Sequence, residues 1–172
     1  MKQGVTMPQE QVTGDVIVCG DRDMTIGVEL YQTGGTGRLA FYCGADTLAY
    51  SDVTFAHVSG ITSALLQVLL IANDYPELAT DEKVRSISVP LTGDVAFTIT
   101  VLFRKAVDYG EIMDAEDGSR FCEVQEWAEP YALELLLGDG ERRFITQVEV
   151  DEANGWHTNL AGLLFRHARL VG

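Results

Sequence analysis

The chain has 172 residues, of which 47% are hydrophobic, so it is long and apolar enough to form a single domain with a core. Twelve Lys and Arg residues stand against 26 Asp and Glu residues, a formal net charge of −14, which repels nucleic acid and anionic membranes and excludes both as partners. No apolar run reaches the roughly 18–20 residues that cross a bilayer, and the N-terminus lacks a signal-peptide pattern, so we expect a cytoplasmic protein.

The first part of the chain is predicted to form strands. Residues 1–13 are polar and expected to be loose, and residues 14–172 are expected to form the domain. The glycines at 34, 35 and 37 predict a hairpin turn, because Gly readily adopts positive φ. A phosphate-binding loop is disfavoured, since Gly37 is followed by a strand pattern and not by Lys and a helix. The predicted strands are 16–19, 25–31, 39–42 and 48–55.

The first helix is predicted to begin at Ser59, a suitable N-cap residue, and to end at Asn73, just before an Asp-Tyr-Pro sequence. Its apolar residues surround nearly the whole circumference. This pattern is typical of a helix that is buried on most sides, against a sheet or in an interface.

The strongest strand pattern of the chain follows at 95–103, where apolar residues alternate, after a shorter strand at 86–91. Residues 114–119 are expected to form an exposed loop. Residues 121–127 fit either a strand or a short helix, and Pro130 is expected to end it.

The last part of the chain is predicted to form a hairpin from residues 131–137 and 142–150, joined by a Gly-Asp-Gly turn. Asn154 and Gly155 are expected to turn the chain into a final helix over 158–170. The order of strands, helix, strands and helix, with no internal repeat, defines the α+β class. We expect a mainly antiparallel sheet of about six to eight strands, one buried central helix and one C-terminal helix.

No catalytic, metal or cofactor site is predicted. The three cysteines, Cys19, Cys43 and Cys122, adjoin apolar runs and are expected to be small buried side chains. The histidines lack metal-ligand spacing, and His167 falls on the apolar stripe of the final helix, as a core or interface histidine would. The acidic loop from Asp114 does not fit a calcium-binding loop, because the glycine comes one position too early.

Acidic residues are concentrated between residues 106 and 141, where eleven acids and Arg120 leave a local charge of −10. Such a surface attracts basic protein surfaces, although the same excess also serves solubility alone. We expect the contacts with a basic partner to come from these acids and from two aromatic anchors. The predicted partner-binding residues are Asp108, Glu111, Asp114, Glu116, Asp117, Glu123, Glu126, Trp127 and Tyr131.

Three function classes remain open. The first, which the absence of a catalytic motif favours, is a non-enzymatic protein-binding domain of the immunity, inhibitor or secretion-chaperone type that engages a basic protein surface. The second is an assembly subunit of a homo-oligomer or phage-type particle, and the third is a small enzyme or ligand-binding domain with a site of dispersed carboxylates and histidines. Arg166, His167 and Arg169 make the end of the final helix basic, either to complement the helix dipole or to pack on the acidic stretch of the same chain or a neighbouring subunit.

Overall fold

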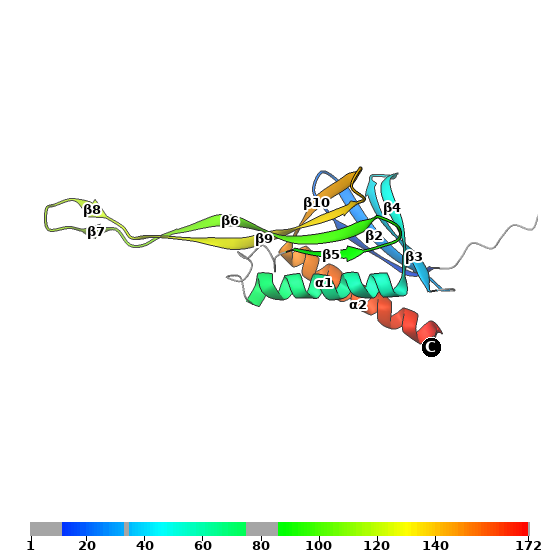
Figure 1. Ribbon diagram of the computed structural model, residues 1–172. Coiled ribbons are helices and arrows are strands. Elements are labelled where there is room, and N and C mark those ends of the chain that lie inside the picture. Colours follow the sequence, from blue (N-terminus) through cyan, green and yellow to red (C-terminus); the bar gives the residue numbers. More distant parts are fainter. Residues whose placement is uncertain (1–11, 33–34, 75–85, 172) are drawn as a thin grey trace, which may run out of the picture.

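The computed structural model of the chain describes residues 12–32, 35–74 and 86–171. Two four-stranded antiparallel sheets and two helices form a body, and a long hairpin projects from it (Figure 1). The predicted α+β class is therefore confirmed. The described residues form ten strands in three sheets, more than the six to eight predicted for one sheet, because the hairpin carries its own two-stranded tip.

The first sheet contains the four predicted N-terminal strands in chain order. Each begins earlier than predicted, and the fourth ends one residue sooner, because Phe55 begins the helix. Its first strand begins at Val12, so residues 12 and 13 belong to the sheet, and the rest of the segment predicted to be loose lies outside the described residues. Its second and third strands form the predicted hairpin, with Gly35 at a φ of 61°. The strands are β1 (Val12–Cys19), β2 (Met24–Tyr31), β3 (Thr36–Cys43) and β4 (Asp46–Thr54).

The first helix, α1 (Phe55–Asp74), begins earlier than predicted, and Ser59 lies inside it. Thr54 caps it instead: its hydroxyl accepts a hydrogen bond from the His57 amide, and His57 Nδ1 accepts one from the Thr54 amide, both 3.1 Å long. The prediction of a central helix packed against a sheet is confirmed, but its burial is one-sided, because an outer face that includes Leu66 and Leu70 is exposed. Among the described helices, α1 alone is long and apolar enough to span a membrane, but its inner face lies in the core of the body.

The second sheet has the order β10-β9-β6-β5, and its two central strands are much longer than predicted. The predicted end at Pro130 is wrong: β9 runs through this residue, which faces Phe103 where the register with β6 shifts. Proline is tolerated at such a bulge because an irregular ladder does not need its missing N–H. The strands are β5 (Ser86–Pro90), β6 (Ala96–Tyr109), β9 (Val124–Gly138) and β10 (Arg143–Glu149).

The final helix, α2 (Val150–Val171), begins before the predicted turn and passes straight through Asn154 and Gly155. Ala153 and Trp156, on either side of that pair, are 1% and 2% exposed, so packing holds the helix across it. Tertiary burial outweighs the poor helix propensity of Asn-Gly.

Gly155→Ala is expected to stabilise the protein by about 0.5–1 kcal/mol, because a methyl group here would touch nothing within 4 Å and alanine favours the helix. Thermal unfolding followed by circular dichroism measures the effect. Gly140→Ala is the contrasting variant. It should lower the stability of the protein, because Gly140 has a φ of 102°, which alanine adopts only with strain. A lower melting temperature for Gly155→Ala would show that the helix is broken at this position.

The two helices lie against the sheets as an antiparallel pair (Figure 1). Phe55 at the start of α1 stacks on His167 near the end of α2 at 5.4 Å, and Asn73 at the other end of α1 donates a 3.1 Å hydrogen bond to Asn154. His167 is 1% exposed, as expected of a core histidine. The helices and both sheets share one core.

The two halves of the body share one order of elements: four antiparallel strands in a meander, followed by a helix. This repetition has no counterpart in the sequence, where no internal repeat was found. The turn between β1 and β2 joins the sheets, because the Asp21 amide donates a 3.1 Å hydrogen bond to the Gln147 carbonyl of β10. Thr92 makes a second link by donating to the Asp52 carbonyl of β4 at 3.1 Å.

Candidate protein interface

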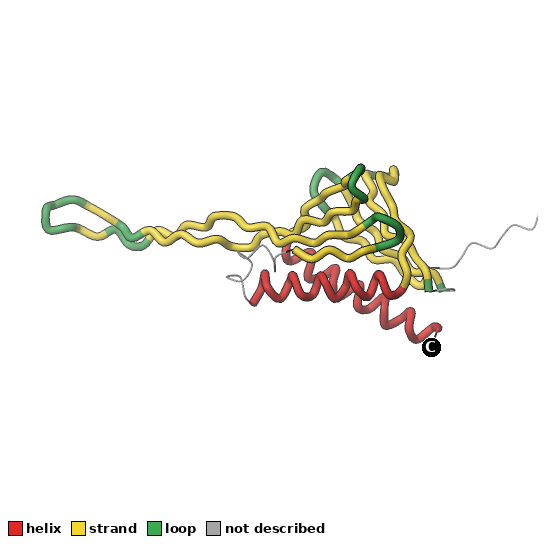
Figure 2. Tube along the Cα trace, in the orientation of Figure 1, coloured by secondary structure: helices red, strands yellow, loops and turns green. Residues whose placement is uncertain are grey.

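The projecting hairpin, residues 104–128, is called the arm here. It consists of the outer halves of β6 and β9 and a tip that contains β7 (Met113–Asp114) and β8 (Arg120–Phe121) (Figure 2). The pairing of β6 with β9 continues from the core out to Tyr109 and Val124 with one shift in register, between Leu102 and Phe103. At about 3.3 Å per residue, the strand geometry allows the arm to reach up to roughly 40 Å from the body.

Each face of the arm carries apolar side chains beside one ion pair. Val107, Tyr109 and Val124 share one face with the pair between Lys105 Nζ and Glu126 Oε1, which are 3.1 Å apart. Trp127 lies on the opposite face. Because neighbouring residues of a strand point to opposite sides, both faces combine aromatic and charged groups.

At the inner end of the Trp127 face, Arg104 Nε lies 2.8 Å from Glu129 Oε1. The same guanidinium lies over the ring of Tyr131 at 5.7 Å. Arg104 therefore ties the foot of the arm to the body.

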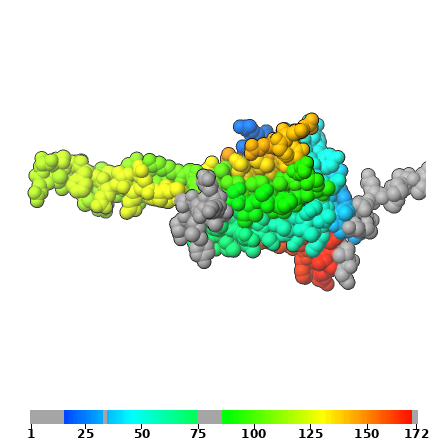
Figure 3. Space-filling view, viewed as in Figure 1, coloured from blue at the N-terminus to red at the C-terminus, as the bar shows by residue number. Residues whose placement is uncertain are grey.

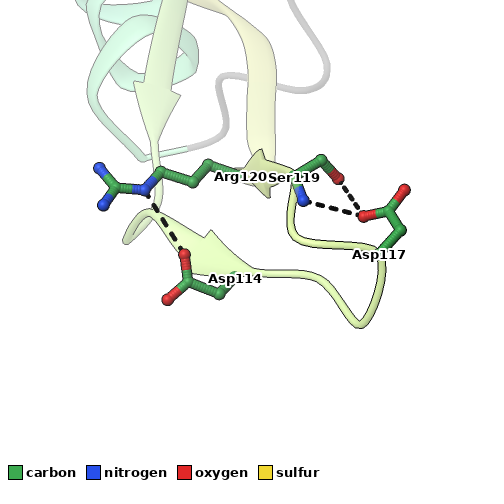
Figure 4. A network of polar contacts seen from close by, with 4 residues as sticks. All are labelled: Asp114, Asp117, Ser119 and Arg120. Carbon is green, nitrogen blue, oxygen red and sulfur yellow. Dashed lines mark hydrogen bonds and ion pairs between the residues drawn. The ribbon is translucent and has the colours of Figure 1, made fainter.

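The tip is held in shape by its own acids (Figure 4). Asp117 accepts hydrogen bonds from the amide and the hydroxyl of Ser119, at 2.9 and 2.6 Å, and Gly118 adopts a φ of 87° in the same turn. The Ser119 hydroxyl and then its amide hold the pKa of the Asp117 carboxyl below its usual range. Asp114 pairs with Arg120 at 3.5 Å, so these two acids shape the tip as well as charging it.

The arm exposes a large part of the apolar surface of the molecule. Of fourteen large hydrophobic residues exposed in the described chain, seven lie on the arm, with Tyr109 69% and Ile112 72% exposed. Figure 3 shows the arm as a narrow projection that stands clear of the body over most of its length. The seven residues are Val107, Tyr109, Ile112, Met113, Phe121, Val124 and Trp127.

The structure brings eight of the nine predicted partner-binding residues together on the arm and places Tyr131 at its foot, half-buried. The acids were found from their density in the sequence. The apolar residues beside them, such as Tyr109 and Phe121, were missed. The alternation of apolar residues over 107–109 was the available signal, because it continues the pattern of β6 beyond the predicted strand end.

The body offers less distinctive sites. No cluster of His, Cys, Asp and Glu in the described ranges could hold a metal ion. The prediction of buried cysteines is wrong. Cys19 and Cys43 are exposed because each ends a strand at the rim of the first sheet, and Cys122, on the arm, is only half-buried. A cavity of about 370 Å³ between β4 and the β9–β10 turn includes Tyr50 and Arg142 in its lining, and a second of about 420 Å³ lies at the foot of the arm.

Comparison of the chain with protein-family models, with curated proteins and with solved structures gives no match.

Proposed function

We propose that this protein is a protein-binding module, and that the arm engages a partner surface that is basic and partly apolar. The observation that carries the proposal is the exposed apolar surface of the arm, set among carboxylates on a ribbon with no core of its own. Isolated two-stranded ribbons are marginally stable in water, so a long one gains from a surface that covers it. Aromatic side chains such as Tyr109 and Trp127 are the residue types that anchor protein interfaces.

The charge of the arm defines the chemistry of the partner. Its three bases, Arg104, Lys105 and Arg120, are all held in ion pairs with acids. The acids Asp108, Glu111, Glu116 and Glu123 have no ion pair with any described residue, so the outward field is negative. Such a field accelerates association with a basic surface and is screened by salt.

Removal of the arm is expected to abolish partner binding and to leave the body folded. In the test variant, residues 106–127 are replaced by an Asn-Gly turn, which joins Lys105 to its cross-strand neighbour Ala128. The melting temperature should change little, because none of the large core side chains lies on the arm. Salt-graded capture of proteins from the cells that make this protein, with the intact and shortened chains side by side, measures binding.

Matched point variants show whether binding needs the apolar residues of the arm or any exposed apolar residue. Tyr109→Ser on the arm is expected to weaken capture, whereas Ile17→Ser on the outer face of the first sheet, where the side chain is 57% exposed, should leave it unchanged. Equal capture by the intact and the shortened chains would refute the proposed function.

A further inference from the structure

We propose that the partner of the arm is the opposite end of a second copy of this chain, so that copies associate head to tail. This inference rests on the proposed function and names its partner. The receiving surface, called the tail patch here, is the outer face of the last turns of α2. It consists of Ala161, Phe165, Arg166, Ala168 and Arg169, all exposed.

The tail patch has the chemistry that the arm requires. Phe165 is 64% exposed, and the Arg169 guanidinium lies over its ring at 5.8 Å, so an aromatic anchor and a positive charge are presented together. Two alanines beside them leave the helix surface flat enough for a ribbon to approach. No acid occurs between residues 153 and 171, which makes this the basic end of an otherwise acidic protein.

Other exposed arginines of the described chain are worse partners for an acidic ribbon. Arg22 stands between two aspartates, and Arg142 and Arg143 follow Glu141. Arg22 lies close enough to Asp21, and Arg142 to Asp139, to help lower the pKa of those carboxyls, so acids stand beside both positive charges. Charge complementarity therefore selects the tail patch.

The arm cannot reach the tail patch of its own chain, because the two lie at opposite ends of the molecule (Figure 1). The arm, which carries most of the acidic stretch, therefore does not meet the basic helix end within one chain. Complementing the helix dipole and packing on a neighbouring subunit stay open for this end of the helix, and the proposal takes the second. A contact between two different surfaces is heterologous, so it leaves one free arm and one free tail patch on every pair. It then produces either a closed ring or an open chain of copies.

The test uses charge reversal on each surface and on both together. The arm-reversed chain carries Glu111→Lys, Glu116→Lys and Glu123→Lys, and the tail-reversed chain carries Arg166→Glu and Arg169→Glu. Wild-type protein is expected to gain mass in light scattering as its concentration rises at low salt, and to lose it as salt is added. Each reversed chain should associate at least about tenfold more weakly, whereas the chain with all five substitutions should associate again.

An equal mixture of arm-reversed and tail-reversed chains gives a sharper result. In the mixture, the native arm of the tail-reversed chain complements the native tail patch of the arm-reversed chain, and the two reversed surfaces complement each other. The two chains should therefore associate in alternation when mixed, although each associates weakly by itself. Phe165→Ser should weaken wild-type association without any change in charge, and Arg22→Glu is the control that should leave it unchanged. Circular dichroism confirms that each variant is folded.

A wild-type chain that stays monomeric up to near-millimolar concentration at low salt would refute self-association. So would a five-substitution chain that fails to regain it. If the monomer still captures another basic protein through its arm, the proposed function stands and only the identity of the partner is wrong. If removal of the arm changes neither self-association nor capture, both proposals are wrong.

Discussion

Trp156→Ala is expected to lower the free energy of unfolding by about 3–5 kcal/mol, because it removes the largest fully buried side chain of the core. The indole lies edge-on to Phe97, with ring centroids 6.4 Å apart, and so links α2 to the second sheet. Urea unfolding followed by far-ultraviolet circular dichroism measures the change.

Trp156→Phe separates the ring from its polar group. The indole Nε1 is buried and has no hydrogen-bond partner among the described residues, so its N–H already costs free energy in the folded state. Phenylalanine keeps much of the ring volume and removes that donor. Trp156→Phe should therefore lower the free energy of unfolding much less than Trp156→Ala does. Trp127→Ala, on the arm and 47% exposed, is the matched control and should change stability by no more than about 0.5 kcal/mol. A comparable loss from Trp127→Ala would show that the arm contributes to the core.

Asp21→Ala is expected to cost about 1–3 kcal/mol by opening the junction between the two sheets. The Asp21 carboxylate accepts hydrogen bonds from the Thr146 hydroxyl and, at 3.0 Å, from the Gln147 amide. Thr146 is 1% exposed, so its hydroxyl would be left in the core without this acceptor. Asp46→Ala, at the same end of the first sheet and exposed, is the control that should have little effect.

The contribution of Asp21 should also depend on pH. The Thr146 hydroxyl and then the Gln147 amide hold the pKa of the Asp21 carboxyl below its usual range, against a smaller opposing effect of burial. A depressed folded-state pKa means that the stabilisation is fully present above the unfolded pKa of about 3.9 and is lost as pH falls through the folded value. The stability difference between wild type and Asp21→Asn should therefore be constant near neutral pH and shrink below about pH 4. A difference that grows with acid would contradict this assignment.

The elements with strong local patterns could be predicted from the sequence, and the errors fall where tertiary contacts decide. The alternation that begins at Val95 correctly indicates a strand, but nothing local shows that it continues past Phe103 and leaves the body. Pro130 and Gly155 are breakers by local rules, and both lie inside regular elements. In the first case a bulge removes the need for a ladder hydrogen bond, and in the second the burial of Trp156 holds the helix.

The candidate site was predicted in part for a similar reason. Charge density is a property of the sequence, so acids such as Glu116 and Glu123 could be selected without a structure. Whether Tyr109 or Phe121 is buried or exposed depends on whether a sheet or helix covers the strand, and in the arm neither does. Apolar residues that look like core in the sequence are then the exposed part of the site.

The arm is continuous with the two central strands of the second sheet, and this has a mechanical consequence. A force that pulls the tip away from the body acts along β6 and β9. These strands could move only if the hydrogen bonds that join them to β5 and β10 broke at the same time. A sideways force on the arm would bend it at the shift in register beside Phe103, because the hydrogen-bond ladder is irregular there. The strand arrangement therefore resists tension along the length of the arm and allows it to bend at its foot.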